Sequence, residues 1–369
     1  MSASTGPLAV DIVITNHNYG DYVCEAVDSA LAQDHPLTRV LVVDDGSTDQ
    51  SRARLRRYEG VAELVLQPNG GQPAAVNAGF ARCTGDVVIF LDADDVLAPG
   101  IVARVASALR LRADAARVQF RMSLIDAAGR PLGLLSPRGH RPLPSGDLRR
   151  AELSFPFDIN WAPGGGSAYR TELLRRIMPV PAHDYGRWGA DYYLVHLTSL
   201  LGPVLALEEI GAYYRVHGRN AFEPSARELA LERVRREIFY QEITRRELAR
   251  VADQLGLDRP GEILSLANVI SRMISHRLAP ELHPVTGDGR AKLMGAALRA
   301  ARRRDDVSLP MRLLSVMAVA ALAGLPRPLA MRLARLLVFP ELRPRVTRAL
   351  ARMHRPAGPL RPAGGGIGR

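Results

Sequence analysis

The N-terminal part of this chain alternates near-continuous apolar runs with segments that carry apolar residues at helical spacing. The runs occupy residues 8–15, 39–44 and 86–92, and helical spacing is found between them at 21–33 and 73–81. Continuous apolar runs are typical of strands that are covered on both faces. Strands that alternate with helices favour a parallel arrangement. We therefore expect an α/β fold with a Rossmann-like, mostly parallel sheet and helices on both of its faces.

Carboxylates are clustered where two of these runs end. Asp44 and Asp45 close one run, and Asp92, Asp94 and Asp95 close another. Strands of a parallel sheet present their carboxyl ends to the ligand crevice, so these groups are expected to lie there. Crowded carboxylates repel one another unless a positive charge neutralises them. Oxygen ligands suit a hard cation such as Mg²⁺ or Mn²⁺, which commonly accompanies a phosphate-bearing substrate.

The remaining pattern predicts further α/β elements and then a helical C-terminal region. Additional strands are expected at 63–66, 117–126 and 210–216, and additional helices at 49–58, 99–112, 171–177 and 192–201. The stretch 129–146 is rich in Gly and Pro and is expected to be a loop. Amphipathic helical patterns follow at 225–255, 260–280 and 288–304, an apolar stretch with interspersed Arg at 311–352, and a Pro/Gly-rich, disordered tail at 356–369.

Basic residues are concentrated in the C-terminal part. Residues 1–220 carry a net charge of −2 and residues 221–369 a net charge of +13. The longest uncharged apolar run, 313–325, is shorter than the roughly 20 residues that a membrane-spanning helix needs. Together with the arginines that follow it, this run suits an anionic membrane face. The alternative is a helical hairpin that packs on the α/β part and turns its arginines to solvent.

Cysteine usage and the N-terminus bear on the compartment. Cys24 and Cys83 provide neither a disulfide framework nor a metal-binding spacing, which favours a reducing compartment. Residues 1–7 lack the basic and apolar regions of a signal peptide. We therefore expect a cytoplasmic location, with peripheral contact at the inner face of the plasma membrane as an additional hypothesis.

The order and spacing of four motifs resemble those of the family 2 glycosyltransferases, which bind nucleotide-diphosphate sugars in a GT-A fold. The resemblance extends over residues 8–220. The motifs are Val-Ile-Thr-Asn-His-Asn at 13–18, Val-Val-Asp-Asp-Gly-Ser-Thr-Asp at 42–49, Asn-Ala-Gly at 77–79 with Gly-Asp at 85–86, and Phe-Leu-Asp-Ala-Asp-Asp at 90–95. Many relatives have a basic residue just before the Asn of the third motif, whereas this chain has Val76.

The resemblance implies roles for the strand-end residues. Thr15 and Asp45 would hold the nucleotide base, with Asp45 accepting from the ring N–H of a uracil-type edge. Mn²⁺ or Mg²⁺ would be held against the diphosphate by Asp92 and Asp94, with Asp95 and His217 as further candidate ligands. The complete set of expected donor-binding residues is Thr15, Asn18, Asp44, Asp45, Asn77, Asp92 and Arg215.

The resemblance also implies a catalytic base about 100 residues after the metal site. In the family this acidic residue is often preceded by Glu, but here Ala190 precedes Asp191, which leaves Asp191 as the single candidate. Asp191 would accept the proton of the acceptor hydroxyl as it attacks the anomeric carbon. The alternative is that Asp191 only caps the helix at 192–201.

Two later segments also resemble family motifs. Arg215 and His217 belong to a Tyr-Arg-x-His segment, where Arg could contact the diphosphate and His could add a metal ligand. A purely structural role is the alternative for a lone His. Residues 163–167 resemble the acceptor-side loop, in which glycines allow close approach of substrate, and an ordinary turn is the alternative.

The resulting expectation is an inverting, metal-dependent glycosyltransferase. Its donor would be UDP-linked, and its acceptor a saccharide or lipid-linked saccharide in cell-surface polysaccharide or glycolipid synthesis. The expected division is a tail at 1–7, a GT-A catalytic domain at 8–222, a basic helical region at 223–355 and the tail at 356–369. Within the catalytic domain, residues 8–112 would form the nucleotide-sugar half and residues 113–222 the acceptor half.

Three other functions would account for part of this pattern. A nucleotidyltransferase shares Asp-x-Asp metal sites, but it would show a Gly-rich basic loop after its first strand, and residues 15–20 contain one Gly and no Lys or Arg. A nucleic-acid-binding protein is suggested by the pI of 10.3. Its basic residues alternate with Glu and have few aromatic neighbours, so no nucleic-acid partner is expected. A non-catalytic binding module is opposed by the intact acidic residues.

Overall fold

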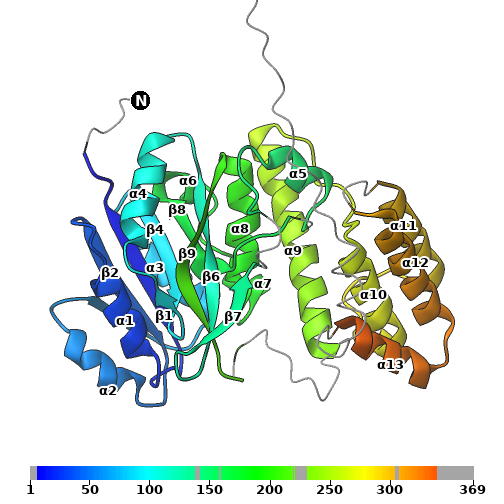
Figure 1. Cartoon of the computed structure of the whole chain (residues 1–369), viewed down its shortest axis with the longest axis horizontal. Coiled ribbons are helices and arrows are strands. Elements are labelled where there is room, and N and C mark those ends of the chain that lie inside the picture. Colours follow the sequence, from blue (N-terminus) through cyan, green and yellow to red (C-terminus); the bar gives the residue numbers. More distant parts are fainter. Residues whose placement is uncertain are drawn as a thin grey trace, which may run out of the picture.

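The predicted apolar runs form the centre of a mixed α/β sheet. The computed structural model describes residues 6–137, 142–157, 159–218, 220, 231–303 and 307–338. Within these residues the sheet has nine strands in the order β3-β2-β1-β4-β8-β6-β9-β5, with β7 paired to β6. Helices cover both faces of the sheet, and a helical region lies beside it (Figure 1). The α/β fold class and the helical C-terminal region expected from the sequence are therefore confirmed.

The element boundaries are as follows. The strands are β1 (Val10–Asn16), β2 (Thr38–Asp45), β3 (Glu63–Gln67), β4 (Val87–Asp92), β5 (Val96–Leu97), β6 (Arg117–Asp126), β7 (Pro131–Ser136), β8 (Ser167–Arg170) and β9 (Val204–Val216). The helices of the α/β part are α1 (Val23–Leu31), α2 (Ser51–Leu55), α3 (Gln72–Phe80), α4 (Ile101–Leu111), α5 (Arg149–Ser154), α6 (Thr171–Leu174), α7 (Ala182–Tyr185) and α8 (Ala190–Leu201). The later helices are α9 (Leu231–Leu255), α10 (Leu266–Leu278), α11 (Arg290–Arg303), α12 (Leu309–Gly324) and α13 (Arg327–Val338).

The four strands β3, β2, β1 and β4 are parallel neighbours. Successive side chains of a strand point to opposite faces, and the two cores reflect this alternation. Ile12 and Ile14 of β1 pack with α1 and α4 on one face, whereas Val13 packs with α3 and α8 on the other. Both faces of β1 and β4 are buried along nearly their whole length, which is why these two strands are largely apolar, whereas the edge strand β3 is more exposed. The register pairs Thr15 with Asp92, which aligns the ends of β1 and β4.

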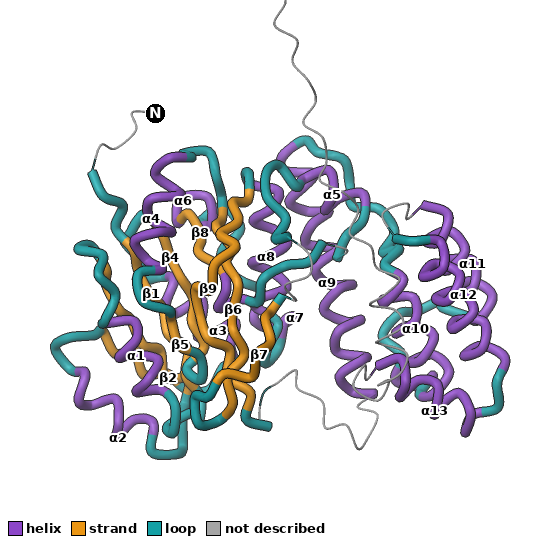
Figure 2. The backbone as a smooth tube through the Cα atoms, viewed as in Figure 1, coloured by secondary structure: helices purple, strands orange, loops and turns teal. Residues whose placement is uncertain are grey.

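The second half of the sheet contains strands that the sequence pattern did not reveal. β8 runs antiparallel between β4 and β6, and β5 pairs antiparallel with β9. β7 lies within the stretch 129–146, which we expected to be a loop (Figure 2). It is a largely exposed edge strand of sequence Pro-Leu-Gly-Leu-Leu-Ser, and its extended conformation comes from pairing with β6 rather than from its own composition.

The helices after residue 230 belong to two different cores. Apolar residues of α9, such as Ile243 and Leu248, pack with α8 in the core on one face of the sheet. The helices α10 to α13 form a separate core around Val269, Met273 and Leu322. α9 is therefore part of the α/β core, and the expected boundary at 222/223 lies outside the described residues. The expected tails at 1–7 and 356–369 lie wholly or mainly outside the described residues.

Candidate active site

A cavity of about 800 Å³ opens at the carboxyl ends of the parallel strands. Seven residues singled out from the sequence line it, and they are Thr15, Asn18, Asp45, Asp92, Asp94, Asp95 and Asp191. Four others are not among the lining residues, and they are Asp44, Asn77, Arg215 and His217. The fold thus brings together side chains that are more than 170 positions apart in the chain.

Asp45 lies at the end of β2 with its carboxylate held by backbone amides. Its Oδ1 accepts from the Gly70 amide at 2.9 Å and from the Gln67 side chain at 2.7 Å, and its Oδ2 accepts from the Gly71 amide at 2.8 Å. Gly71 has a φ of +85°, and a Cβ there would lie 2.8 Å from the carbonyl oxygen of Gly186. A glycine is therefore required for the close approach that orients Asp45.

The neighbouring Asp44 has a different environment. Its side chain is fully buried and accepts hydrogen bonds from Asn16, from the Ser47 amide and from Arg52. Burial alone would raise its pKa, but the bonds from Ser47, Arg52 and Asn16 outweigh burial and lower the pKa of Asp44. The Asp44 carboxylate therefore fixes the turn after β2, and its expected contact with a donor stays a prediction.

The acidic motif after β4 places three carboxylates near one another. Burial, reinforced by the charges of Asp191 and Asp94, raises the pKa of Asp92 to about 7. Burial together with the charges of Asp94 and Asp92 also raises the pKa of Asp95. Asp92 accepts from the Thr15 hydroxyl at 3.3 Å and from the Gln72 side chain at 3.1 Å. These contacts do not neutralise the accumulated negative charge.

Arg215 and His217 support this motif from behind. Arg215 is buried, donates through Nε to the Asp94 carbonyl and through its backbone amide to Asp95, and pairs with Glu25. The His217 Nε2 lies 3.0 Å from the Asp94 carboxylate. Neither residue lines the cavity, and the Arg215 guanidinium anchors the acidic loop. The expected contact of Arg215 with a diphosphate stays a prediction.

Asn77 is likewise used for structure. Its side chain donates to the Val180 carbonyl at 2.8 Å and accepts from the Val180 amide at 2.8 Å. Both ends of the amide are therefore engaged by one backbone unit of the segment before α7. The Asn77 side chain therefore has a structural role, and its expected contact with a donor stays a prediction.

Asp191 lies in the first turn of α8 and faces the cavity. Its Oδ2 accepts from the Gly164 amide at 3.1 Å, and burial raises its pKa. α8 begins at Ala190, and its N-cap position is Gly189, so Asp191 is not the N-cap residue of this helix. A Cβ on Gly164 would lie 2.0 Å from Asp191 Oδ1, so the glycine-rich segment 163–167 leaves room for this carboxylate.

The acidic residues have the chemistry that a hard cation requires, although they do not form a complete cage. Among the described residues, no group of three or more His, Cys, Asp or Glu side chains is placed to hold a metal ion. Mg²⁺ is commonly bound by one or two carboxylates together with substrate phosphates and water. Asp92, which is partly buried, and the buried Asp94 repel one another and fit that mode of binding.

The cavity also has a second half, most of which lies within the expected acceptor half at 113–222, although these individual side chains were not singled out from the sequence. Its lining residues come mainly from the segment before β8, from α8 and from α9, and they include Phe157, Trp161, Trp188, Tyr192, His196, Glu237 and Gln241. Glu237 and Gln241 are four positions apart on α9, which is the spacing of one helix face. In the sequence this pair cannot be distinguished from the many other polar residues of the same helix.

Comparison with known proteins assigns the N-terminal part of the chain to a protein family. Residues 11–178 match the family model described as "Glycosyl transferase family 2". The chain carries a family 2 glycosyltransferase domain. Among the relatives of this glycosyltransferase, an uncharacterized glycosyltransferase of Nostoc sp. is 36% identical over 217 residues, which cover 58% of this chain and 66% of that protein.

Other similarities are more limited. The succinoglycan biosynthesis protein ExoO of Rhizobium meliloti is 33% identical over 132 residues, covering 34% of this chain and 37% of that protein. The glycosyltransferase therefore spans less than two thirds of these relatives' length. The crystal structure of S. aureus TarS has a TM-score of 0.50 at 16% identity, covering 89% of this chain and 54% of that one. At this identity the likeness concerns the fold alone.

Proposed function

We propose that this glycosyltransferase transfers a sugar from a UDP-linked sugar to a hydroxyl group of an acceptor, with inversion at the anomeric carbon. The observation that carries the proposal is the shared cavity, because the acidic residues Asp92, Asp94 and Asp95 and the carboxylate of Asp191 line it together. Their proximity is reflected in the pKa of Asp92, which burial and the charge of Asp191 raise. Two separate carboxylate functions at one site suit a metal-bound leaving group and a general base.

The donor's base is held at the ends of β1 and β2. Asp45 is oriented by the amides of Gly70 and Gly71, so a carboxylate lone pair can accept from the ring N–H of uracil. Thr15 and Asn18 line the same side of the cavity. Asn18 has a positive φ of 60° and accepts from the Thr48 amide at 2.8 Å, so its position is set by the turn after β2.

In the proposed transfer step, Asp191 is the general base for the acceptor hydroxyl. The acceptor oxygen bonds to the anomeric carbon as the bond from that carbon to the diphosphate oxygen breaks, and the bonding electrons leave with the diphosphate. Asp191 accepts the proton from the attacking hydroxyl. Asp92 and Asp94 would hold Mn²⁺ or Mg²⁺, which when bound supplies Lewis-acid stabilisation of the charge on the leaving diphosphate. The Gly164 amide orients the Asp191 carboxylate.

A donor panel tests this proposal. Release of nucleotide diphosphate is measured with UDP-, GDP- and TDP-linked sugars, with Mn²⁺ and then with excess EDTA. We expect turnover with a UDP-sugar that EDTA abolishes and added Mn²⁺ restores. Absence of metal-dependent turnover with every donor would contradict the proposal.

The base is tested separately from donor binding. Asp191→Asn removes the proton acceptor and keeps the size of the side chain, so transfer should fall by at least about 100-fold. The affinity for UDP, measured by calorimetry, should remain within about twofold of the parent because the proposed contacts with the base come from Thr15 and Asp45 and not from Asp191. Loss of UDP binding would show that the role of Asp191 is misassigned.

The proposed acceptor is a saccharide or lipid-linked saccharide of a cell-surface polysaccharide or glycolipid. One relative is named as a succinoglycan biosynthesis protein, which supports a polysaccharide product. No helix of the described residues is long and apolar enough to cross a membrane. α12 nevertheless exposes Leu309, Leu313 and Met317, so we also propose peripheral contact of this helix with an anionic membrane face.

A further inference from the structure

The second half of the cavity contains a buried Glu–His pair that the transfer step does not use. Glu152 of α5 is fully buried, and its Oε1 lies 2.9 Å from Nδ1 of His196 on α8. The carboxylate therefore accepts a hydrogen bond from Nδ1–H and fixes the orientation of the ring. His196 is 5% exposed and lines the cavity. Its Nε2 has no hydrogen-bond partner within the part of the chain that the structure describes.

Aromatic rings surround this imidazole. The ring centroids of Phe157, Trp161 and Tyr192 lie 4.6, 5.7 and 6.0 Å from that of His196. The guanidinium of Arg117, which is itself buried, packs 4.5 Å from the centre of the Trp161 ring and holds the indole in place. The indole Nε1 is buried and has no partner within the described residues. This wall is therefore apolar over most of its area and carries a few unused polar groups.

Backbone strain is found at the same place. Phe157 has a φ of +67°, a conformation that is rare for a bulky side chain. Within the described residues, Asn18 is the other non-glycine residue with a positive φ, and both line this cavity. Residues held in such conformations tend to cluster at ligand sites, where the surrounding structure fixes them. The strain at Phe157 accompanies the placement of its ring against His196.

Helix α9, which lies C-terminal to the residues that match the family model, forms one wall of this half of the cavity. Glu237 and Gln241 of α9 line the cavity, and burial raises the pKa of Glu237. Gln241 accepts from the Asn268 side chain of α10, which connects the cavity wall to the C-terminal helical core. The wall thus combines aromatic rings, an oriented imidazole and a carboxylate. Protein sites that bind a small polar ligand with an apolar face have this composition.

We propose that this half of the cavity is the acceptor subsite and that it binds a sugar ring. The rings of Phe157, Trp161 and Tyr192 cover the C–H face of the sugar, and Nε2 of His196, held by Glu152, forms a hydrogen bond with one of its hydroxyls. Glu237 accepts from a second hydroxyl. This inference rests on the proposed function, because Asp191 of the same cavity would receive the proton of the reacting hydroxyl.

Tryptophan fluorescence offers a direct test without turnover. The chain contains two tryptophans, Trp161 and Trp188, and both line the cavity. In a Trp188→Phe background all indole emission comes from Trp161, beside His196. This protein is titrated, in the presence of UDP and Mn²⁺, with the methyl β-glycosides of glucose, galactose and N-acetylglucosamine. We expect a saturable change of emission with at least one glycoside.

The pair is then tested by substitution in the same background. His196→Ala and Glu152→Gln should each weaken glycoside binding by about tenfold, which corresponds to about 1.4 kcal/mol. The affinity for UDP should stay within about twofold for both variants. His183→Ala is the matched control, because His183 is a fully exposed histidine on α7, outside the cavity lining. Thermal unfolding is followed for each variant, and His196→Gln replaces His196→Ala if the alanine variant unfolds.

The outcomes separate this inference from the proposed function. If UDP binds but no glycoside changes the emission, or if glycoside binding survives both substitutions, the subsite assignment is wrong while the donor site stands. If UDP itself does not bind, the proposed function fails first. If the Glu–His pair is merely structural, the two substitutions will lower the unfolding temperature and leave the ratio of glycoside affinity to UDP affinity unchanged. That result would also overturn the assignment.

Discussion

At the scale of single residues, the local environment of each carboxylate decides its use. Asp44 and Asp45 are adjacent, yet the first is fully bonded inside a turn and the second faces the cavity with its orientation set by two glycine amides. Asp92 and Asp191 face the same cavity, and burial raises the pKa of both. Carboxyl groups of one chemical type therefore serve as a structural anchor, a proposed base reader, a proposed metal ligand and a proposed proton acceptor.

Gly164→Ala tests how closely the Asp191 carboxylate is positioned. The added Cβ would lie 2.0 Å from Oδ1, so the carboxylate has to move by more than an ångström. A displacement of this size is expected to reduce transfer by about 100-fold, because the base no longer meets the reacting hydroxyl. Transfer is measured as nucleotide diphosphate release with acceptor present. UDP affinity should be retained.

Gly289→Ala is the matched control for this substitution. No atom lies within 4 Å of a Cβ at that position, and its φ is not in the left-handed region. The control should keep the parent rate. Equal rates for Gly164→Ala and the parent would show that the Asp191 carboxylate is not confined as described.

At the scale of elements, long-range contacts set how helices and strands lie around the cavity. The Asn77 side chain connects α3 to the segment before α7 over 103 positions of sequence. α9 packs on α8 and supplies Glu237 and Gln241 to the cavity wall. The cavity is thus completed by an element that lies outside the residues matched by the family model.

Asn77→Ala should mainly affect stability. It leaves the amide and carbonyl of Val180 without their partners, which is expected to cost about 2 kcal/mol of unfolding free energy. Chemical denaturation measures this loss. The KM for the donor should change by less than about twofold, because Asn77 does not line the cavity. A large rise in donor KM at unchanged stability would instead support the donor-binding role expected from the sequence.

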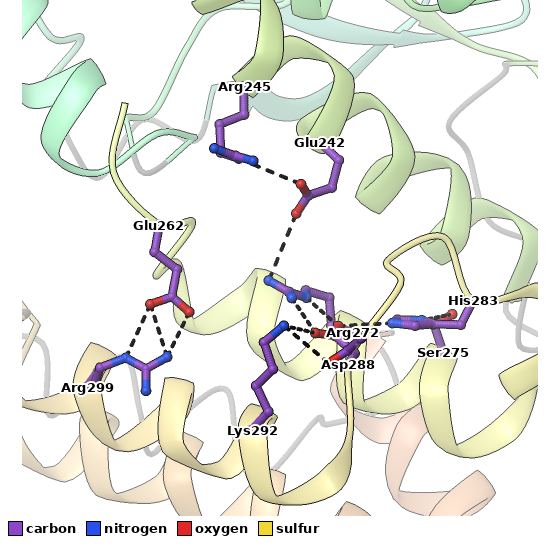
Figure 3. A network of polar contacts seen from close by, with 10 residues as sticks. Glu242, Arg245, Glu262, Arg272, Ser275, His283, Asp288, Lys292 and Arg299 are labelled. Atoms are coloured by element: carbon purple, nitrogen blue, oxygen red, sulfur yellow. Dashed lines mark hydrogen bonds and ion pairs between the residues drawn. The ribbon is translucent and has the colours of Figure 1, made fainter. Parts of the chain in front are cut away.

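At the scale of the whole molecule, two cores are joined by polar contacts around α9 and α10. Figure 3 shows Arg272 of α10 directed at Asp288, with His283 and Lys292 around the same carboxylate. Arg272 also lies 4.0 Å from Glu242 of α9. The Asp288 side chain is fully buried and accepts from Arg272 at 2.6 and 2.8 Å. This network connects the loop before α11 to the rest of the helical core.

Asp288→Asn should destabilise the helical core in a pH-dependent way. Burial alone would raise the pKa of Asp288, but hydrogen bonds from His283 and Arg272 lower it far below the ordinary value. The stabilisation is therefore present above the unfolded pKa of about 3.9 and is lost as the pH falls toward the folded pKa. At pH 7 the variant should lose about 3 kcal/mol of unfolding free energy, since Arg272 remains buried without its partner.

Unfolding curves between pH 3 and pH 7 measure this effect. The difference between parent and variant should be largest at pH 7 and should shrink below about pH 4. Asp114→Asn removes an exposed pair with Arg112 and should leave the curves unchanged. A constant difference across the range would contradict the assigned pKa direction.

Membrane contact is also a property of the whole molecule. Leu313 of α12 is 53% exposed, and its burial in an anionic membrane face would be lost in Leu313→Glu. Binding to vesicles that contain phosphatidylglycerol should weaken about tenfold. Leu66→Glu on β3, at 58% exposure, is the matched control and should bind as the parent does. The proposal would be contradicted if Leu313→Glu bound these vesicles as tightly as Leu66→Glu does. It would also be contradicted if a chain lacking residues 302–369 bound them as tightly as the full chain.

The sequence was most informative where structure depends on neighbours along the chain. Each apolar run and the acidic residues at its end are contiguous, so β1, β2, β4 and the positions of Asp45 and Asp92 could be predicted. Roles that depend on partners far away could not. Asn77 and Arg215 were expected at a ligand, but Val180 and Glu25 engage their side chains. β7 was missed because its partner strand, rather than its composition, makes it extended.

By itself, the sequence determined the α/β class, the parallel strands and the set of carboxylates at their ends, because hydrophobic periodicity and strand-end chemistry are local properties. Only the tertiary structure decided which of those carboxylates face a common cavity, and that α9 forms part of its wall. It alone joined Glu152 to His196 across 44 positions and surrounded the imidazole with aromatic rings. Such pairings depend on how the helices pack on the sheet, and no local pattern encodes that packing.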